Sequence, residues 1–240
     1  MNAGGAHRPR NVGWARAAAF LYGDWGTSKA YVIGFAFMAA GFSSFPIILA
    51  VCAFTGLVGY NYIIVCKHFP DGGGVYSAAR DMSRVLAVLG SLLLIADFIV
   101  TAALSGWDAM IYLGVPHEYV KLATLGVIVA IGCLNYFGPK HSGSLAVSLA
   151  VPMVCVVVLI ICLSLPHLSF AALGHTRHLF SRSNWVAFVG VILALSGVEA
   201  IANLTGVLKL DNGCSPSAPT VAKTARKAIT PVATVITAAG

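Results

Sequence analysis

The first apolar stretch of the chain is interrupted by Tyr22-Gly23-Asp24-Trp25-Gly26-Thr27-Ser28-Lys29. Residues 17–21 before this segment and 32–35 after it are apolar, so a membrane helix through both would carry the polar segment inside the bilayer. Glycine favours irregular backbone, and Ser and Thr can hydrogen-bond backbone groups that a broken helix leaves free. The break is therefore predicted to involve Gly23, Gly26, Thr27 and Ser28, with Asp24 beside it.

A later apolar stretch is interrupted in the same way by Leu195-Ser196-Gly197-Val198-Glu199, where Gly197 supplies the break. Irregular backbone at membrane depth is tolerated only where protein or a cavity covers it. Two interrupted spans at corresponding places are typical of a transporter's site near the middle of the membrane. We therefore predict that the first and sixth spans are equivalent members of two five-helix inverted repeats.

The composition indicates an all-α polytopic membrane protein. The chain is 58% hydrophobic and 10% charged, whereas soluble chains carry about 25% charged residues. Spans need about 20 apolar residues, and we predict them at 15–40, 44–67, 85–107, 119–137, 143–166 and 185–208, with a seventh that starts near residue 228. The expected parts are a cytoplasmic tail (1–14), the first repeat (15–166), an external loop (167–184) and the incomplete second repeat (185–240).

The net charge of +7 follows from membrane topology. With the N-terminus in the cytoplasm, all but four of the 15 lysines and arginines fall in cytoplasmic segments; the exceptions are Lys29, Lys121, Arg177 and Arg182. This bias obeys the positive-inside rule and predicts a multi-pass protein of the cell membrane with a cytoplasmic N-terminus. The basic residues lie in separate short loops, so no nucleic-acid partner is expected.

Three carboxylates lie inside apolar stretches, Asp24, Asp97 and Glu199, although the chain has only eight. An ionisable side chain in hydrocarbon costs at least about 2.5–3.5 kcal/mol and by default marks a pathway, a partner or a proton site. Asp97, Thr101 and Ser105 are spaced by four residues and line one face of a helix. Potassium and sodium are coordinated by oxygen, so these groups predict one pocket that holds a cation.

Each of these residues also has a structural interpretation. Thr101 and Ser105 are suited to polar contacts between packed helices. Asp24 can cap the second half of a broken helix, and Tyr31 can be an aromatic residue at the membrane interface. Glu199 can pair with Lys29 or stay protonated.

Other kinds of site find little support in the sequence. His175 and His178 could touch a metal, but no further ligand is placed to help. The five cysteines in or near spans, with no C-x-x-C pair, are interpreted as small buried hydrophobic residues. No set of nucleophile, base and orienting group appears, so we expect neither an enzyme nor a cofactor.

The pattern Y-G-D-x-G-T-S at residues 22–28, followed by Tyr31, resembles the first-span signature of the KUP (HAK/KT) potassium uptake permeases. The turn P-D-G-G-G-V-Y at residues 70–76 and the sixth span resemble the wider amino acid–polyamine–organocation (APC) superfamily, over about residues 14–240. The resemblance implies a LeuT-type fold and proton-coupled potassium uptake. By position, the cation would be bound by Asp24, Tyr31, Asp97, Thr101, Ser105 and Ser196, and Glu199 would carry the proton.

The chain departs from this family in length, because a full transporter of this fold has ten or more spans. A truncated product, half of a split transporter that pairs with a second-half subunit or forms a homodimer, and a decayed gene are the alternatives. An amino-acid or amine permease is the second functional hypothesis, although Asp24 would repel a substrate carboxylate. A membrane interaction protein that transports nothing is the third.

Lys29 stands where the KUP pattern usually has proline, and this difference gives the first testable prediction. An ammonium in the pocket would repel a bound cation, because two positive charges in a desolvated site repel each other. Lys29→Pro should therefore raise potassium uptake, measured in cells that lack other potassium uptake systems. If uptake is unchanged and Lys29 extends to a polar surface, Lys29 has no role in the site.

Overall fold

The computed structural model describes residues 10–26, 34, 36–38, 41, 44–167, 185, 188–189, 197–214 and 218–239. These residues are helical apart from turns and one isolated bridge between Val12 and Leu208. The chain divides into two compact units. Unit 1 comprises Met1–Gly74 and Gly143–Gly240, and unit 2 comprises Val75–Ser142.

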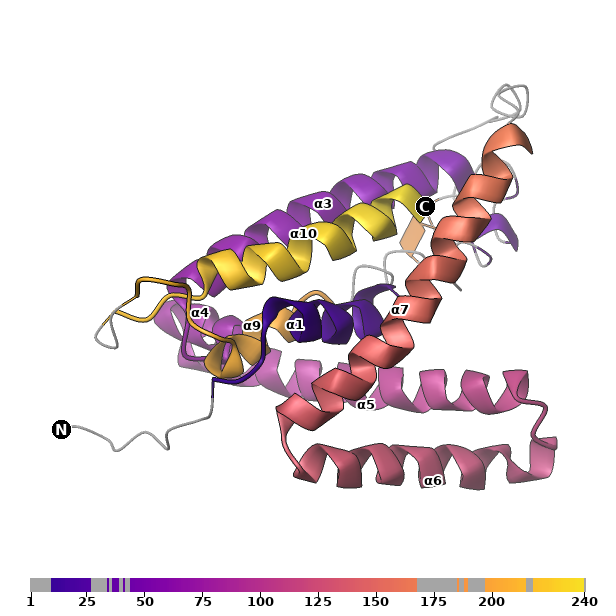
Figure 1. Cartoon of the computed structure of the whole chain (residues 1–240), viewed down its shortest axis with the longest axis horizontal. Helices are drawn as coiled ribbons and strands as arrows, with labels where there is room; N and C mark the ends of the chain where they lie inside the picture. The colour runs from indigo at the N-terminus through magenta and orange to yellow at the C-terminus, as the bar shows by residue number, and fades with distance from the viewer. Residues whose placement is uncertain are drawn as a thin grey trace. The chain divides into compact units, whose positions relative to one another are not determined.

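Among the residues that the structure describes, four helices are long and apolar enough to cross a membrane (Figure 1). They are α3 (Ser44–His68), α5 (Arg84–Tyr112), α6 (His117–Tyr136) and α7 (Pro139–Ser164), the last continued by a 3-10 turn at Leu165–His167. Each coincides with a predicted span, although α5 extends beyond the predicted end to Tyr112. These helices are those of an all-helical membrane protein.

The predicted first and sixth spans lie only partly within the described residues. The first begins with α1 (Trp14–Leu21) and passes into a π-helical turn, η1 (Tyr22–Gly26). The sixth ends with a short helix, α9 (Ala200–Leu204), and a 3-10 turn, η6 (Thr205–Val207). The count of six spans and the LeuT-type arrangement therefore stay predictions.

Unit 2 is built around the antiparallel pair of α5 and α6. Ser83 caps α5, since its hydroxyl accepts a hydrogen bond from the N–H of Leu86 at 3.5 Å. The helices pack closely where α5 carries Gly106, because a Cβ atom there would lie 2.9 Å from Cγ2 of Thr124. Near the connecting turn, the ring of Trp107 meets that of His117 edge-on, with centroids 5.7 Å apart. The predicted turn at residues 70–76 leads into α4 (Gly74–Met82).

Arg10 joins three segments of unit 1 that are distant in sequence. Its guanidinium donates hydrogen bonds to the carbonyl oxygens of Pro70 and Thr205, both at 3.1 Å, and to Oδ1 of Asp71 at 2.8 Å. The segments also meet through their backbones, since a Cβ atom on Gly206 would lie 2.6 Å from the carbonyl oxygen of Asp71. Only glycine, which has no Cβ atom, can occupy position 206 this close to Asp71. The start of the chain, the turn after α3 and the end of the sixth span therefore form one cluster.

The same end of unit 1 carries its described positive charges. The N–H of Lys209 donates to the carbonyl of Val12 at 2.9 Å, which places the segment after η6 beside the segment before α1. The remaining cations lie near the start of α1, in the last turn of α3 and in the first turns of α10 (Ala222–Ala239), namely Arg10, Arg16, Lys67, Lys223, Arg226 and Lys227. The described lysines and arginines of unit 1 are therefore gathered at one end, and the assignment of this end to the cytoplasm stays a prediction.

Helix α10 is held at its N-terminus by Asp211, which lies outside the helix. Its carboxylate is buried and accepts hydrogen bonds from the N–H of Lys223 at 2.8 Å and from the N–H of Thr224 at 2.9 Å. The Thr224 hydroxyl donates at 3.0 Å and the Thr220 hydroxyl at 3.3 Å. This cap explains why α10 begins as early as Ala222, six residues before the start predicted for a seventh span. Along the helix, α10 packs against α3 and α1 (Figure 1).

The cap gives a prediction about stability. Asp211→Ala leaves the first N–H groups of α10 without acceptors and should lower the free energy of unfolding by about 1–2 kcal/mol. The measurement is unfolding in mixed micelles, together with hydrogen exchange at the amides of Lys223 and Thr224. Asn212→Ala, at an exposed neighbouring position, is the control and should change neither.

The pH dependence of this contribution follows from the pKa of Asp211. Burial raises this pKa, but the hydrogen bonds from Lys223, Thr224 and Thr220 outweigh burial and hold it below its usual value of 3.8. A lowered pKa in the folded state means that the stabilisation is complete above the unfolded value and fades as the pH falls below it. The difference between wild type and Asp211→Ala should therefore shrink below about pH 4; a difference that grows there would contradict the assignment.

Candidate functional site

The first predicted break has non-α geometry. The chain leaves α1 at Leu21 and forms a π-helical turn through Tyr22–Gly26. Single π turns inside helices are rare and often occur at functional sites. Within this turn Tyr22 and Trp25 are buried, while the side chain of Asp24 is half-buried. An acidic side chain thus lies at the irregular point of the first span.

The second break lies directly against the first. Residues 197–199 form a turn in which Gly197 has φ +109°, a backbone conformation that side chains other than glycine's rarely adopt. A Cβ atom on Gly197 would lie 2.7 Å from the backbone nitrogen of Trp25 and 2.8 Å from its Cα. The backbones of the π turn and of the 197–199 turn are therefore in contact, and Gly197 is required by both its conformation and its surroundings.

Glu199 stands at this contact and is 9% exposed. The N–H of Gly197 lies 3.0 Å from each of its two carboxylate oxygens, Oε1 and Oε2, and donates to them. Helix α9, which follows Glu199 directly, packs against α3. Glu199 thus occupies a buried position at the end of the 197–199 turn, immediately before α9.

Trp25 anchors the π turn to the neighbouring helices. Its side chain is fully buried, and its ring lies beside Gly59 of α3, where a Cβ atom would lie 3.2 Å from Cη2 of Trp25. Ile229 of α10 approaches the same glycine. The indole Nε1 is buried without a hydrogen-bond partner among the described residues. Trp25 was not among the predicted site residues. Its position between Asp24 and Gly26, inside the polar segment that interrupts an apolar stretch, was the signal that could have identified it.

The other described candidates belong to unit 2. Asp97, Thr101 and Ser105 lie on the continuous helix α5 and share one of its faces, as their spacing requires. Asp97 and Thr101 are half-buried within the chain, and Ser105 is exposed. Their convergence with Asp24 and Glu199 stays a prediction. Five candidates lie outside the described residues: Thr27, Ser28, Lys29, Tyr31 and Ser196.

Two subsidiary expectations concern cysteines and metals. Cys52 and Cys66 are buried, as predicted, but the prediction is wrong for Cys133, Cys155 and Cys162, which are exposed on the surfaces of α6 and α7. Apolar helix surfaces that face lipid accommodate such small side chains. Within the described part of the chain, no group of three or more His, Cys, Asp or Glu residues could hold a metal ion.

Comparisons with protein-family models, with curated proteins and with solved structures found no match for this chain.

The contact between the breaks predicts a large effect of Gly197→Ala. The methyl group would meet the Trp25 backbone, and the positive φ would be strained. Gly213 is the matched control, because it has φ +88° but open space around its missing Cβ. Gly213→Ala should cost about 1–2 kcal/mol for its conformation, and Gly197→Ala a further ~1–3 kcal/mol for the clash.

Unfolding of both variants in mixed micelles, followed by tryptophan fluorescence, measures this difference. Equal losses for Gly197→Ala and Gly213→Ala would contradict the contact between the two breaks.

Proposed function

We propose that this chain is a secondary active membrane transporter, or half of one, that imports a small cation, namely potassium together with protons. The observation that carries the proposal is the contact of Gly197 with the backbone of Trp25. It brings two irregular segments, each with an acidic residue, to one place between apolar helices. Irregular backbone and acidic side chains are costly in a membrane unless they line a site.

The chemistry of these groups favours a cation. Asp24 is half-buried and Glu199 is buried, so two negative charges would face a poorly solvated region. Buried charges persist when they are paired, protonated or coordinated to an ion. A potassium ion accepts carboxylate, hydroxyl and carbonyl oxygens as ligands. The two breaks supply carboxylate and carbonyl oxygens. The sequence hypothesis assigns the hydroxyl ligands to Thr101 and Ser105 of α5.

Glu199 is the group that we assign to the proton. Its carboxylate is held by the Gly197 N–H at the second break, so a change in its protonation acts directly on the turn that touches Trp25. A proton on Glu199 removes one of the two acidic charges, and its release restores that charge. Proton movement and cation binding are therefore coupled through the same pair of breaks.

Uptake of rubidium, as a potassium tracer, tests the proposal in vesicles that contain the chain. Asp24→Asn should abolish uptake while membrane insertion stays intact, because an anionic ligand is lost. Glu199→Gln should first weaken the dependence of uptake on pH between about pH 5 and pH 8.

Two exposed carboxylates serve as matched controls, with Asp108→Asn for the first variant and Glu118→Gln for the second. Unchanged uptake by both site variants across this pH range would overturn the cation site. If the chain takes up an organic amine instead of rubidium, and both site variants lose this uptake, then the site is correct but its substrate is an amine.

A further inference from the structure

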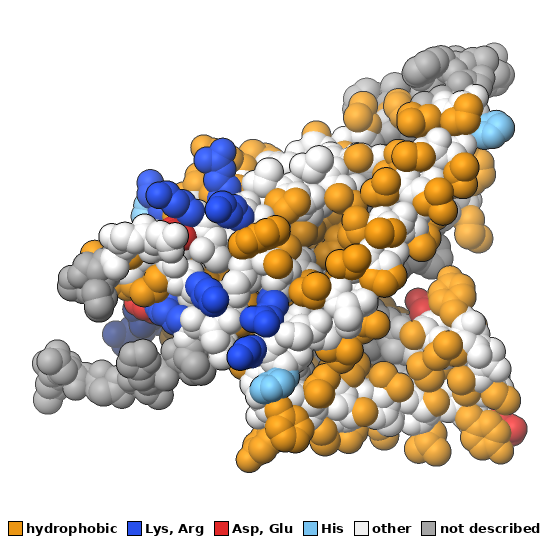
Figure 2. All heavy atoms as spheres, viewed as in Figure 1, with side chains coloured by type: hydrophobic (Ala, Val, Ile, Leu, Met, Phe, Trp, Pro, Cys, Tyr) orange, Lys and Arg blue, Asp and Glu red, His pale blue; other side chains and the backbone are white. Residues whose placement is uncertain are grey.

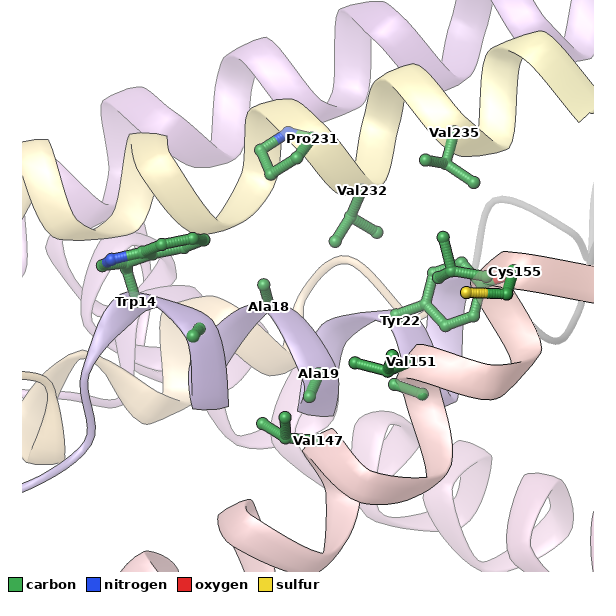
Figure 3. Close-up of a pocket in the computed structure, with 13 residues that line it drawn as sticks. Trp14, Ala18, Ala19, Tyr22, Val147, Val151, Cys155, Pro231, Val232 and Val235 are labelled. Atoms are coloured by element: carbon green, nitrogen blue, oxygen red, sulfur yellow. The ribbon is translucent and has the colours of Figure 1, made fainter. Parts of the chain in front are cut away.

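A groove of about 350 Å³ lies within unit 1 between α1, α7 and α10 (Figure 3). Its volume is more than twice that of the ~150 Å³ apolar cavity that admits benzene. It is lined by Trp14, Ala15, Ala18, Ala19 and Tyr22 of α1, by Val147, Ala150, Val151, Val154 and Cys155 of α7, and by Pro231, Val232 and Val235 of α10. Nearly every lining group is apolar, so the groove is suited to hydrocarbon rather than to an ion or a polar solute.

The groove has two distinguishable ends. Figure 3 shows Trp14 at one end with Pro231 above it, and Tyr22, Cys155 and Val235 at the other. Ala18 and Val232 point into the space between the ends (Figure 3). Since α1 begins at Trp14 beside the cluster formed by Arg10, the Trp14 end is the basic end of unit 1.

Basic side chains stand at this end. Arg16 of α1 donates from Nε to the hydroxyl of Ser144 at 3.1 Å, one turn of α7 before Val147 of the groove wall. Lys227 of α10 is exposed and lies one turn before Pro231 on the same face of its helix. Figure 2 shows further Lys and Arg side chains near the start of α10, while hydrophobic side chains cover its later turns. An apolar groove therefore opens towards a positively charged rim.

We propose that the groove binds an anionic phospholipid of the cytoplasmic leaflet, with an acyl chain between α1, α7 and α10 and the phosphate at Arg16 and Lys227. Basic pockets between helices on the cytoplasmic side of a membrane are suited to acidic lipid headgroups. Trp14 lies at the boundary between headgroup and chain, where tryptophan is favoured. The positive rim attracts an anionic lipid more strongly than a neutral one. It would repel the equally basic end of a second copy of the chain.

Photo-crosslinking in vesicles tests the proposal. The full chain is reconstituted with phosphatidylglycerol or phosphatidylcholine that carries the same photoreactive group on its acyl chain, and labelled peptides are mapped by mass spectrometry. We expect phosphatidylglycerol to label residues 147–155 and 231–235 more than phosphatidylcholine does.

Filling the groove should remove this labelling. Val151→Trp places an indole in the groove, and Val156→Trp is its matched control, because Val156 lies on the same helix, is similarly exposed (54% against 56%) and does not line the groove. Ala18→Trp fills the groove from the opposite wall and keeps the test valid if Val151→Trp is poorly folded. The labelling should persist only in the control.

The headgroup contact is tested separately. Removing one cation by Lys227→Gln or Arg16→Gln should weaken the preference for phosphatidylglycerol by about fivefold each, whereas Arg226→Gln should leave it unchanged. An equal effect of Arg226→Gln would show that only the net charge matters and would overturn the site. Equal labelling by both lipids would also overturn it. A change of oligomeric state in Val151→Trp, without a change in lipid labelling, would assign the groove to a second copy of the chain.

Discussion

The packing of Gly197 on the backbone of Trp25 is the constraint on which unit 1 depends. A close approach of two backbones requires a residue without a side chain, and the positive φ of Gly197 requires the same residue. The contact fixes the π turn at Tyr22–Gly26 against the turn at residues 197–199. It also places Glu199 in a buried position, where its carboxylate accepts a hydrogen bond from the N–H of Gly197.

The rest of unit 1 supports this contact from its basic end. Arg10 ties the segment before α1 to the turn after α3 and to the end of the sixth span. The backbone bonds between Val12 and the residues around Leu208 add a second connection between the same two segments. Asp211 then fixes the start of α10, which packs on α3 and α1. Each connection is local, and together they hold residues 10–26 beside residues 197–209.

The sequence was sufficient to predict the long apolar helices, because hydropathy and length decide whether a segment can cross a membrane. It pointed to Gly26 and Gly197 as breaks, because glycine close to an acidic residue within an apolar stretch favours irregular backbone. It could not predict that α10 begins at Ala222, since the cap comes from Asp211, eleven residues earlier. Nor could it indicate the burial of Trp25, which depends on the space left at Gly59. Such contacts depend on tertiary packing, which spacing along the chain does not encode.

Binding of one cation by the acids at the two breaks is tested most directly by infrared difference spectroscopy of the reconstituted chain. Exchange of a large organic cation for potassium should shift the carboxylate stretching bands. We predict a shift that is lost in Asp24→Asn and in Glu199→Gln and retained in Glu118→Gln. A spectrum without potassium-dependent carboxylate bands, or with bands that persist in both site variants, would contradict the shared cation site.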